Sequence, residues 1–319
     1  MSVGRAPCPV CLRGSPAPVC RAVLSPGHER GISRCPDCGA AYYFPIPSGE
    51  EIARCYPPAY FGGFFKQYWK DYCKGRAYAE RLTSWRREGD LLDVGCALGT
   101  MLAGVRDHSR WRVRGIEFSP AAAALGRGLN GLQIESVPLT AAPWPDGEFD
   151  CVHVNNVLEH ESDPRAALLA AARLLRPGGR LELTVPNGPV DLLPNIELSR
   201  KLGRAFPTRH GGHLFFFSRR SLEILLADCG LRAVSIRCFH LKLGFKARGW
   251  LPRAYRQFLA DAKEPAGRAS ESLSLEQGKA LIPSPPNWPL YRFSSFLRRL
   301  WRFSGSEFGY DFEVVAEKL

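Results

Sequence analysis

The sequence lacks any run of eighteen consecutive apolar residues, which is about the length that a helix needs to cross a bilayer, so we expect no membrane span. It also lacks a basic N-terminal segment followed by an apolar run, because Pro7, Cys8 and Pro9 occur almost at once. A secretory signal peptide is therefore not expected, and we predict a cytoplasmic protein. The 319 residues are 45% hydrophobic, which favours one main domain with a large core and some appendages.

No long tract of basic residues is present either, although the chain is basic overall. Its 43 Lys and Arg residues exceed its 31 Asp and Glu residues and give a formal net charge of +12. A positive surface can bind a phosphate backbone, so a nucleic-acid partner stays open as the less favoured alternative. Because the basic residues are dispersed along the chain, we favour a small-molecule partner.

Eleven cysteines are present, but their spacing does not indicate disulfides. The segments Cys8–Cys11 and Cys35–Cys38 each have the pattern Cys-x-x-Cys and are separated by 23 residues, which is typical of a zinc ribbon in a reducing compartment. Four thiolates close the coordination sphere of the metal, so we predict a structural zinc ion bound by Cys8, Cys11, Cys35 and Cys38. A redox-active disulfide pair is the alternative.

An acidic, glycine-rich turn follows an apolar strand and precedes a helix, in the sequence LLDVGCALGT at residues 91–100. Gly95 and Gly99 let the backbone pass close to a ligand, and the first amides of the helix point into the same crevice. Glu117 ends a second apolar strand, twenty-two residues beyond Gly95. A carboxylate there can accept hydrogen bonds from both hydroxyls of a ribose, so these residues predict a nucleoside-binding site.

A dinucleotide dehydrogenase is the competing interpretation, since it also combines a glycine turn with a downstream acid. Its fingerprint, Gly-x-Gly-x-x-Gly, cannot be placed on residues 95–100. Asp93 inside the turn also suits a cofactor with an amino-acid end and no pyrophosphate. The pattern therefore favours a different nucleoside cofactor.

This sequence resembles the class I S-adenosylmethionine-dependent methyltransferases in three features. They are the glycine turn, the acid after the second strand, and the passage of loops, strands and a helix over residues 143–185. The resemblance implies a Rossmann-like, doubly wound α/β fold with a seven-stranded sheet in the order 3-2-1-4-5-7-6. It also implies that S-adenosylmethionine is the cofactor. The residues at the family's cofactor positions are Asp93, Gly95, Cys96, Gly99, Glu117, Phe118, Leu139, Thr140 and Asn155.

Two positions depart from the family pattern. Ala97 replaces the middle glycine of the turn, a change that needs room for only one methyl group. Pro138 stands where family members often have an aspartate that meets the adenine amino group. Adenine is therefore expected to be held by the backbone at Leu139 and Thr140, or by the side chains of Thr140 and Trp144.

One branch of the family carries a cysteine-rich segment before the methyltransferase core, and this chain resembles that branch from about residue 8 to residue 240. The segment 290–303 has an apolar face with arginines around it, so it is predicted either to cover the core or to contact an anionic membrane peripherally. The parts that we expect are a zinc-ribbon-like segment at 1–45, an aromatic bridging segment and helix at 46–88, and the core at 89–319 with an insertion at about 240–306.

Three histidines are candidates for the chemistry of the acceptor, because they follow strands whose C-terminal ends face the ligand crevice. His213 matches a histidine that branch members often carry before the next helix, and His160 and His210 are the other two candidates. A histidine with a near-neutral pKa can remove a proton from an acceptor hydroxyl, but such a ring can also do no more than pack and fix a loop. The bridging segment carries three aromatic residues, Tyr56, Tyr60 and Phe61. We expect them either to cover the cofactor, to line the acceptor site, or only to join the bridging segment to the core.

The leading prediction is an enzyme that transfers the methyl group of S-adenosylmethionine to a small molecule, such as a sugar, a lipid or a secondary-metabolite intermediate. O-, C- and N-methylation all stay open. An RNA methyltransferase that docks through the zinc ribbon and the basic surface is the first alternative, although no Asn-Pro-Pro-Tyr motif follows the fourth strand. A non-catalytic cofactor-binding protein is the second alternative. The sequence does not predict an oligomeric state.

Overall fold

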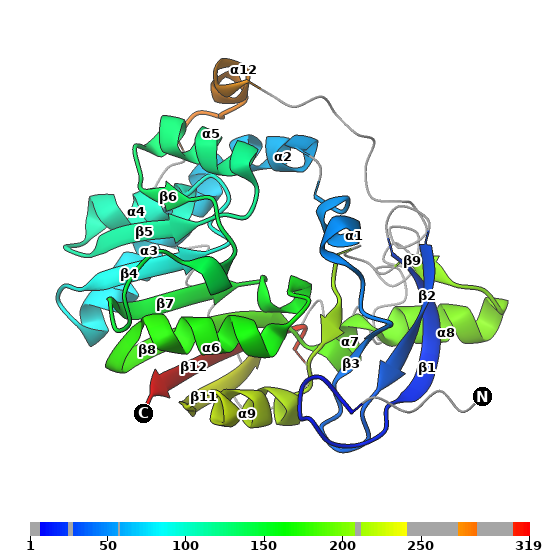
Figure 1. The fold of residues 1–319 in the computed structure, drawn as a ribbon. Coiled ribbons are helices and arrows are strands. Elements are labelled where there is room, and N and C mark those ends of the chain that lie inside the picture. Colours follow the sequence, from blue (N-terminus) through cyan, green and yellow to red (C-terminus); the bar gives the residue numbers. More distant parts are fainter. Residues whose placement is uncertain (1–6, 25–27, 57, 208–211, 241–273, 286–308) are drawn as a thin grey trace.

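The computed structural model describes residues 7–24, 28–56, 58–207, 212–240, 274–285 and 309–319. Its larger part is a seven-stranded sheet with helices on both faces (Figure 1). The strands follow the spatial order β11-β12-β8-β7-β4-β5-β6. Their bounds are β4 Asp90–Val94, β5 Arg112–Ile116, β6 Ile134–Glu135, β7 Phe149–Asn155, β8 Leu175–Pro186, β11 Leu231–Phe239 and β12 Asp311–Lys318.

This spatial order is the predicted one, because numbering these strands along the chain gives 3-2-1-4-5-7-6. β4 pairs in parallel with β5 and β7, and β7 pairs in parallel with β8. β12 is antiparallel to both β8 and β11. All five residues of β4 are buried, as expected for a parallel strand that is covered on both faces. The prediction of a doubly wound, Rossmann-like sheet is confirmed.

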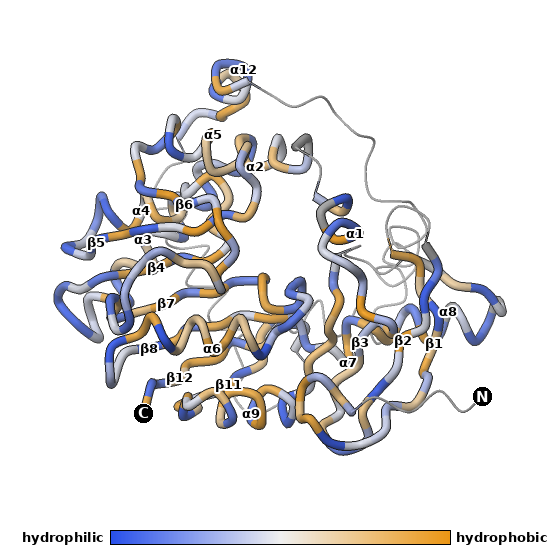
Figure 2. The backbone as a smooth tube through the Cα atoms, in the orientation of Figure 1, coloured by the Kyte–Doolittle hydropathy of each residue, from blue (hydrophilic) through white to orange (hydrophobic). Residues whose placement is uncertain are grey.

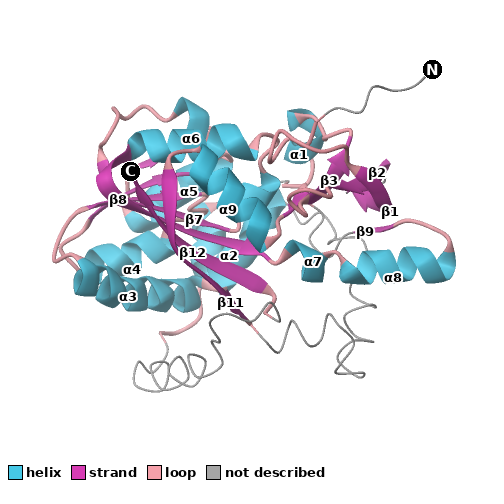
Figure 3. Ribbon diagram, turned by 90° about the horizontal axis from the view of Figure 1, so that it is seen from below, coloured by secondary structure: helices cyan, strands magenta, loops and turns pink. Residues whose placement is uncertain are grey.

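Helices α3 (Tyr68–Trp85) and α4 (Thr100–His108) lie on one face of this sheet, and α6 (Pro164–Leu174) and α9 (Arg219–Asp228) lie on the other (Figure 3). Figure 2 shows hydrophobic residues along β4 and β7, between these layers. Asp163 accepts a hydrogen bond from the amide of Ala166 and so caps the N-terminus of α6. The other helical elements of this part are α5 Pro120–Asn130, α7 Gly188–Asp191, α8 Leu193–Leu202, η2 Leu139–Ala141 and η3 Leu158–His160.

A smaller five-stranded sheet lies beside the larger one, in the order β10-β3-β2-β1-β9 (Figure 1). The sequence did not predict β9 (Phe206–Pro207) and β10 (Phe215–Phe216), which come from the segment after β8. Phe215 pairs with Tyr42 of β3, and their ring centroids are 5.7 Å apart. The strands of the cysteine-rich segment are β1 Ala17–Leu24, β2 His28–Arg34 and β3 Ala41–Phe44.

The bridging segment connects this small sheet to α3. Within the predicted insertion, the structure describes residues 274–285, which contain α12 (Leu275–Ala280). The segment 290–303 lies outside the described residues. No helix in the described part of the chain is long and apolar enough to cross a membrane. The elements of the bridging segment are α1 Gly49–Ala53, η1 Pro58–Phe61 and α2 Gly62–Lys66.

Candidate functional site

The predicted glycine turn joins β4 to α4 at the edge of the sheet where the parallel strands end. Gly95, Ala97 and Gly99 all have positive φ angles, of 70°, 49° and 66°. The amide of Gly95 donates a hydrogen bond to the carbonyl of Ile116 at 2.8 Å, which fastens the turn to β5. A Cβ atom on Gly95 would lie 2.4 Å from Val157 Cγ2, so this position has neither the backbone angle nor the room for a side chain.

Glu117 lies directly after β5, and only 7% of its surface is exposed. Its carboxylate accepts hydrogen bonds from the amides of Ala97 and Ser119, both at 2.9 Å. Burial raises the pKa of this carboxyl group, while the two amides oppose that shift. A carboxylate has about four lone-pair positions, so Glu117 keeps the capacity to accept hydrogen bonds from ribose hydroxyls.

Asp93 is buried near the end of β4 and pairs with His153 of the neighbouring strand β7. Asp93 Oδ1 lies 2.7 Å from His153 Nδ1, and the imidazole packs against the ring of Tyr78 with 5.0 Å between centroids. Because an ionised carboxylate only accepts hydrogen bonds, Nδ1 of His153 carries the proton. The sequence analysis missed His153, because the contact arises from the register of two strands that are distant along the chain.

The other predicted cofactor positions differ in exposure. Cys96 is buried inside the turn and Leu139 is buried in η2, whereas Thr140 and Asn155 are exposed. Phe118 has 63% of its surface exposed directly beside Glu117. An exposed aromatic ring at this position offers a surface on which a planar base can stack.

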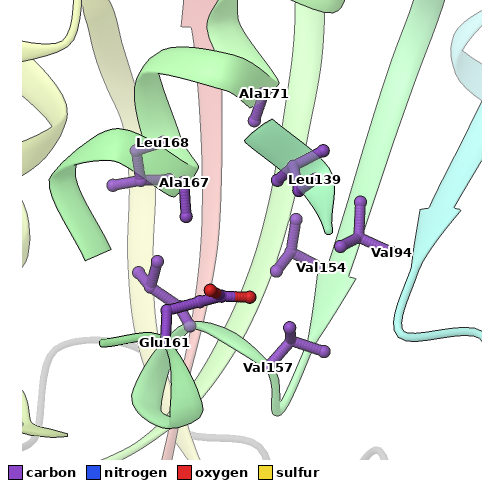
Figure 4. A pocket seen from close by; sticks show the side chains of 9 residues that line it. Val94, Leu139, Val154, Val157, Glu161, Ala167, Leu168 and Ala171 are labelled. Atoms are coloured by element: carbon purple, nitrogen blue, oxygen red, sulfur yellow. The ribbon is translucent and has the colours of Figure 1, made fainter. Parts of the chain in front are cut away.

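An apolar pocket lies between α6 and the ends of β4 and β7 (Figure 4). Figure 4 shows the side chain of Glu161 pointing into this pocket, and burial raises the pKa of its carboxyl group. Leu139 and Val157 belong to the lining, so the pocket adjoins both the predicted adenine position and the glycine turn. The remaining lining residues are Val94, Val154, Leu158, Ala167, Leu168 and Ala171.

The structure brings together two of the three candidate histidines. The ring centroids of His160 and His213 are 4.8 Å apart, whereas His210 lies outside the described residues. His213 is buried, and its Nδ1 lies 2.8 Å from Asp191 Oδ2. The Nδ1 of His160 lies 2.8 Å from the carbonyl oxygen of Gly212. The Gly212 carbonyl and the Asp191 carboxylate only accept hydrogen bonds, so we assign the proton of each ring to Nδ1, and the hydroxyl of Tyr56 then accepts from His160 as well. In this tautomer Nε2 holds the lone pair when either ring is neutral.

Glu159 lies between the two histidines, and the sequence analysis did not select it. The residue is fully buried, with its Oε1 at 3.8 Å from His160 Nε2 and at 3.9 Å from His213 Nε2. These distances are too long for hydrogen bonds, and neither carboxylate oxygen accepts a hydrogen bond within the described part of the chain. Burial raises the pKa of Glu159 to about 7, although the charge of His213 acts in the opposite direction.

Aromatic side chains of the bridging segment extend from the histidines to the glycine turn. Tyr56 Oη lies 2.5 Å from His160 Nδ1, and the ring of Tyr56 meets that of Tyr60 edge-on with 5.3 Å between centroids. Tyr60 in turn contacts Phe61 at 5.2 Å, and Phe61 packs in one hydrophobic cluster with Ala97. The same short segment therefore contacts both the candidate acceptor residues and the candidate cofactor turn.

The four predicted zinc ligands converge at the base of the small sheet. Cys8, Cys11, Cys35 and Cys38 are all buried, and their Sγ atoms lie within 4.8 Å of one another. The Sγ atoms of Cys8 and Cys38 are 3.8 Å apart, and those of Cys11 and Cys35 are 3.7 Å apart. Sulfurs bound at 2.3 Å to a tetrahedral zinc ion lie about 3.8 Å apart, so this cluster fits a structural zinc ion.

Comparison with known proteins assigns the larger part of the chain to a family. A family model described as "Methyltransferase domain" matches residues 66–236, which is more than half of the sequence. The chain belongs to this methyltransferase family. The resemblance predicted from the glycine turn and Glu117 is therefore confirmed.

Similar proteins match the methyltransferase over part of its length. It is 36% identical over 124 residues to an uncharacterized 37.1 kDa protein in transposon Tn4556 of Streptomyces fradiae. That match covers 35% of this chain and 35% of the relative. The methyltransferase is 37% identical over 105 residues to the ubiquinone biosynthesis O-methyltransferase of Xanthomonas oryzae pv. oryzae, over 30% of this chain and 43% of that one. The chain thus spans less than half the length of these two relatives. A solved structure of a SAM-dependent methyltransferase from Archaeoglobus fulgidus is 16% identical, covers 76% of this chain and 92% of its own, and has a TM-score of 0.42.

Proposed function

We propose that this methyltransferase transfers the methyl group of S-adenosylmethionine to a hydroxyl group of a small molecule. The observation that carries the proposal is the continuous row of Tyr56, Tyr60 and Phe61 between the histidines and the glycine turn. A cofactor at the turn and an acceptor at the histidines would share this aromatic wall. The sulfonium is already an activated donor, so holding the methyl group in line with the acceptor atom supplies much of the acceleration.

In this proposal the cofactor lies along the ends of β4 and β5. Asp93 is near its amino-acid end, Glu117 accepts hydrogen bonds from its ribose, and Phe118 and Leu139 flank its adenine. The backbone of the turn can approach the ligand closely because Gly95 and Gly99 have no side chains. The buried carboxylates of Asp93 and Glu117 support this arrangement, since each is held in place by a hydrogen bond within the protein.

The acceptor would face His160 and His213, which we propose as the catalytic residues. A hydroxyl acceptor must lose its proton during methyl transfer, and assistance with that step is worth on the order of a hundredfold or more in rate. An acceptor with a hydroxyl group also agrees with the names of the matched Xanthomonas relatives, which are O-methyltransferases. The zinc ion proposed at the four cysteines would be structural, because four thiolates leave no open position for a substrate.

The test uses methyl-labelled S-adenosylmethionine with an extract of small molecules, lipids and RNA. We expect label in a small-molecule or lipid fraction, and a loss of at least tenfold in rate for His213→Gln. His108→Gln is the matched control, because the Nδ1 of His108 forms a hydrogen bond with the carbonyl of Gly104 within α4 and the residue is not part of the candidate site. Nuclease-sensitive label in RNA would overturn the proposal in favour of an RNA methyltransferase. Cofactor binding without label in any fraction would overturn it in favour of a non-catalytic protein.

A further inference from the structure

We propose that Glu159, His160 and His213 form a second metal site, which binds a divalent transition-series cation next to the acceptor. The role of this cation in methyl transfer rests on the function proposed above. The binding of the cation does not, because it follows from the geometry and charge of the three side chains alone.

The three candidate ligand atoms already point toward one volume. Glu159 Oε1 lies at 3.8 and 3.9 Å from the Nε2 atoms of His160 and His213, and all three ligand atoms lie within 4.8 Å of one another. Ligands bound at 2.0–2.2 Å to a tetrahedral or octahedral metal are about 3 to 3.6 Å apart. The two distances from Glu159 therefore need to shorten by several tenths of an ångström, and the third distance, which is at most 4.8 Å, by about 1 to 2 Å at most. Rotations about side-chain torsions can supply both changes.

The hydrogen bonds behind the two imidazoles match those of metal-binding histidines. A metal-bound histidine almost always donates its other ring N–H to a carboxylate or a carbonyl, which fixes the ring and its tautomer. Here His213 donates from Nδ1 to Asp191, at 2.8 Å, and His160 donates from Nδ1 to the carbonyl of Gly212, also at 2.8 Å. Both rings therefore direct Nε2, the nitrogen suited to a metal, toward Glu159.

The buried carboxylate supplies a second, independent observation. Glu159 has no exposed surface, and neither of its oxygens accepts a hydrogen bond within the described residues. No described Lys or Arg lies within ion-pair distance of it. A buried carboxylate without hydrogen bonds is costly, and a bound dication would compensate its charge directly. Two imidazoles and one carboxylate favour Zn²⁺, Fe²⁺, Co²⁺ or Mn²⁺ over the harder Mg²⁺.

Three protein ligands leave open coordination positions, unlike the four cysteines. An acceptor hydroxyl that occupied one of them would have a lowered pKa and would release its proton to solvent, and His160 and His213 would then act as metal ligands and not as bases. The resulting oxygen anion would form a bond to the methyl carbon as the carbon–sulfur bond breaks. The electron pair of that bond stays on sulfur, so the products are the methyl ether and S-adenosylhomocysteine.

The probe is Co²⁺, added to full-length protein that retains zinc at its cysteines and has been dialysed against a chelator at neutral pH. We expect about one Co²⁺ per chain, with the weak absorption bands of nitrogen and oxygen ligands and without the intense bands of thiolate ligands. Glu159→Gln and His213→Gln should bind Co²⁺ at least tenfold more weakly, whereas the control His108→Gln should bind like the wild type. Absence of Co²⁺ binding, thiolate bands alone, or equal affinity in all four proteins would overturn the inference.

Folding of the variants is checked separately by thermal unfolding in the presence of chelator. Glu159→Gln removes a buried charge, so its melting temperature should equal or exceed that of the wild type. Addition of Co²⁺ should stabilise the wild type and the control His108→Gln, and should stabilise Glu159→Gln and His213→Gln much less. Failure of the two proposals is distinguishable. Co²⁺ binding without transfer to any acceptor would refute the function alone, whereas transfer that is equally fast in metal-stripped protein and in Glu159→Gln would refute the metal's role alone.

Discussion

Replacement of Ala97 with glycine is expected to leave the stability of the protein almost unchanged, which is unusual for a buried alanine. Ala97 has a φ angle of 49°, and only 8% of its surface is exposed. An L-residue other than glycine loses about 1–2 kcal/mol in the left-handed region. Ala97→Gly should recover that amount, while its amide keeps the hydrogen bond to Glu117.

Two opposing contributions nearly cancel this recovery. Removal of one buried methyl group costs about 0.8 kcal/mol. The greater freedom of glycine in the unfolded chain costs about 0.4–1 kcal/mol more. The free energy of unfolding of Ala97→Gly should therefore lie within about 1 kcal/mol of the wild-type value.

Ala122→Gly provides the control, because Ala122 packs in the same hydrophobic cluster but lies in the helix α5. This variant loses a methyl group and helix propensity with no strain to relieve, so it should lose about 1.5 kcal/mol. Urea unfolding followed by tryptophan fluorescence measures both variants. If Ala97→Gly lost as much stability as Ala122→Gly, the argument that the turn holds Ala97 under strain would be wrong.

Three further predictions concern the cofactor, the metal and acid stability. Glu117→Gln presents an amide group to two backbone donors and loses one charge-assisted hydrogen bond of about 1.5–3 kcal/mol. The affinity for S-adenosylhomocysteine, measured by calorimetry, should therefore fall at least tenfold, and an unchanged affinity would refute the ribose contact. Cys35→Ser should lower the zinc content measured by mass spectrometry to well under one ion per chain, and an unchanged content would reject the four-thiolate site. Burial raises the pKa of Asp90, but hydrogen bonds from Arg112 and Arg176 outweigh this and leave the pKa below its ordinary value. The ionised group therefore stabilises the fold above its unfolded pKa of about 4 and loses that contribution as the pH falls further. The free energy of unfolding in urea should accordingly decline less steeply from pH 5 to pH 3 in Asp90→Asn than in the wild type, and parallel curves would contradict this.

Local sequence patterns predicted the larger sheet because each of its elements is defined by nearby residues. The apolar run before Gly95 and the capping pair Asp163 and Pro164 mark element boundaries within a few positions. The helix expected within residues 46–88 is α3, at Tyr68–Trp85. The four cysteines likewise converge as their spacing predicts, since a tight turn brings together each pair.

Features that depend on contacts between distant segments were not predicted. The Asp93–His153 pair follows from strand register, and Glu159 becomes notable only because the loop that carries His213 folds over it. Ala97 was interpreted as a question of room for one methyl group, whereas the structure shows that its backbone angle is the larger departure. The backbone angle at one residue depends on the whole turn, and the residue type alone does not reveal it.

The mixed origin of the small sheet bears on how such enzymes can be recombined. The amide of Leu214 donates a hydrogen bond to the carbonyl of Glu159 at 2.7 Å. Phe215 and Phe216 then pair with β3, and Ser218 Oγ donates a hydrogen bond to the carbonyl of Cys38 at 2.6 Å. One stretch of five residues thus reaches from the candidate acceptor site to the cysteine cluster. A chimera that exchanged only the N-terminal segment would replace β1 and β3, the strands with which β9 and β10 pair. The cysteine-rich segment and the segment after β8 therefore form one structural unit, and a chimera is expected to fold best when it takes both from the same parent.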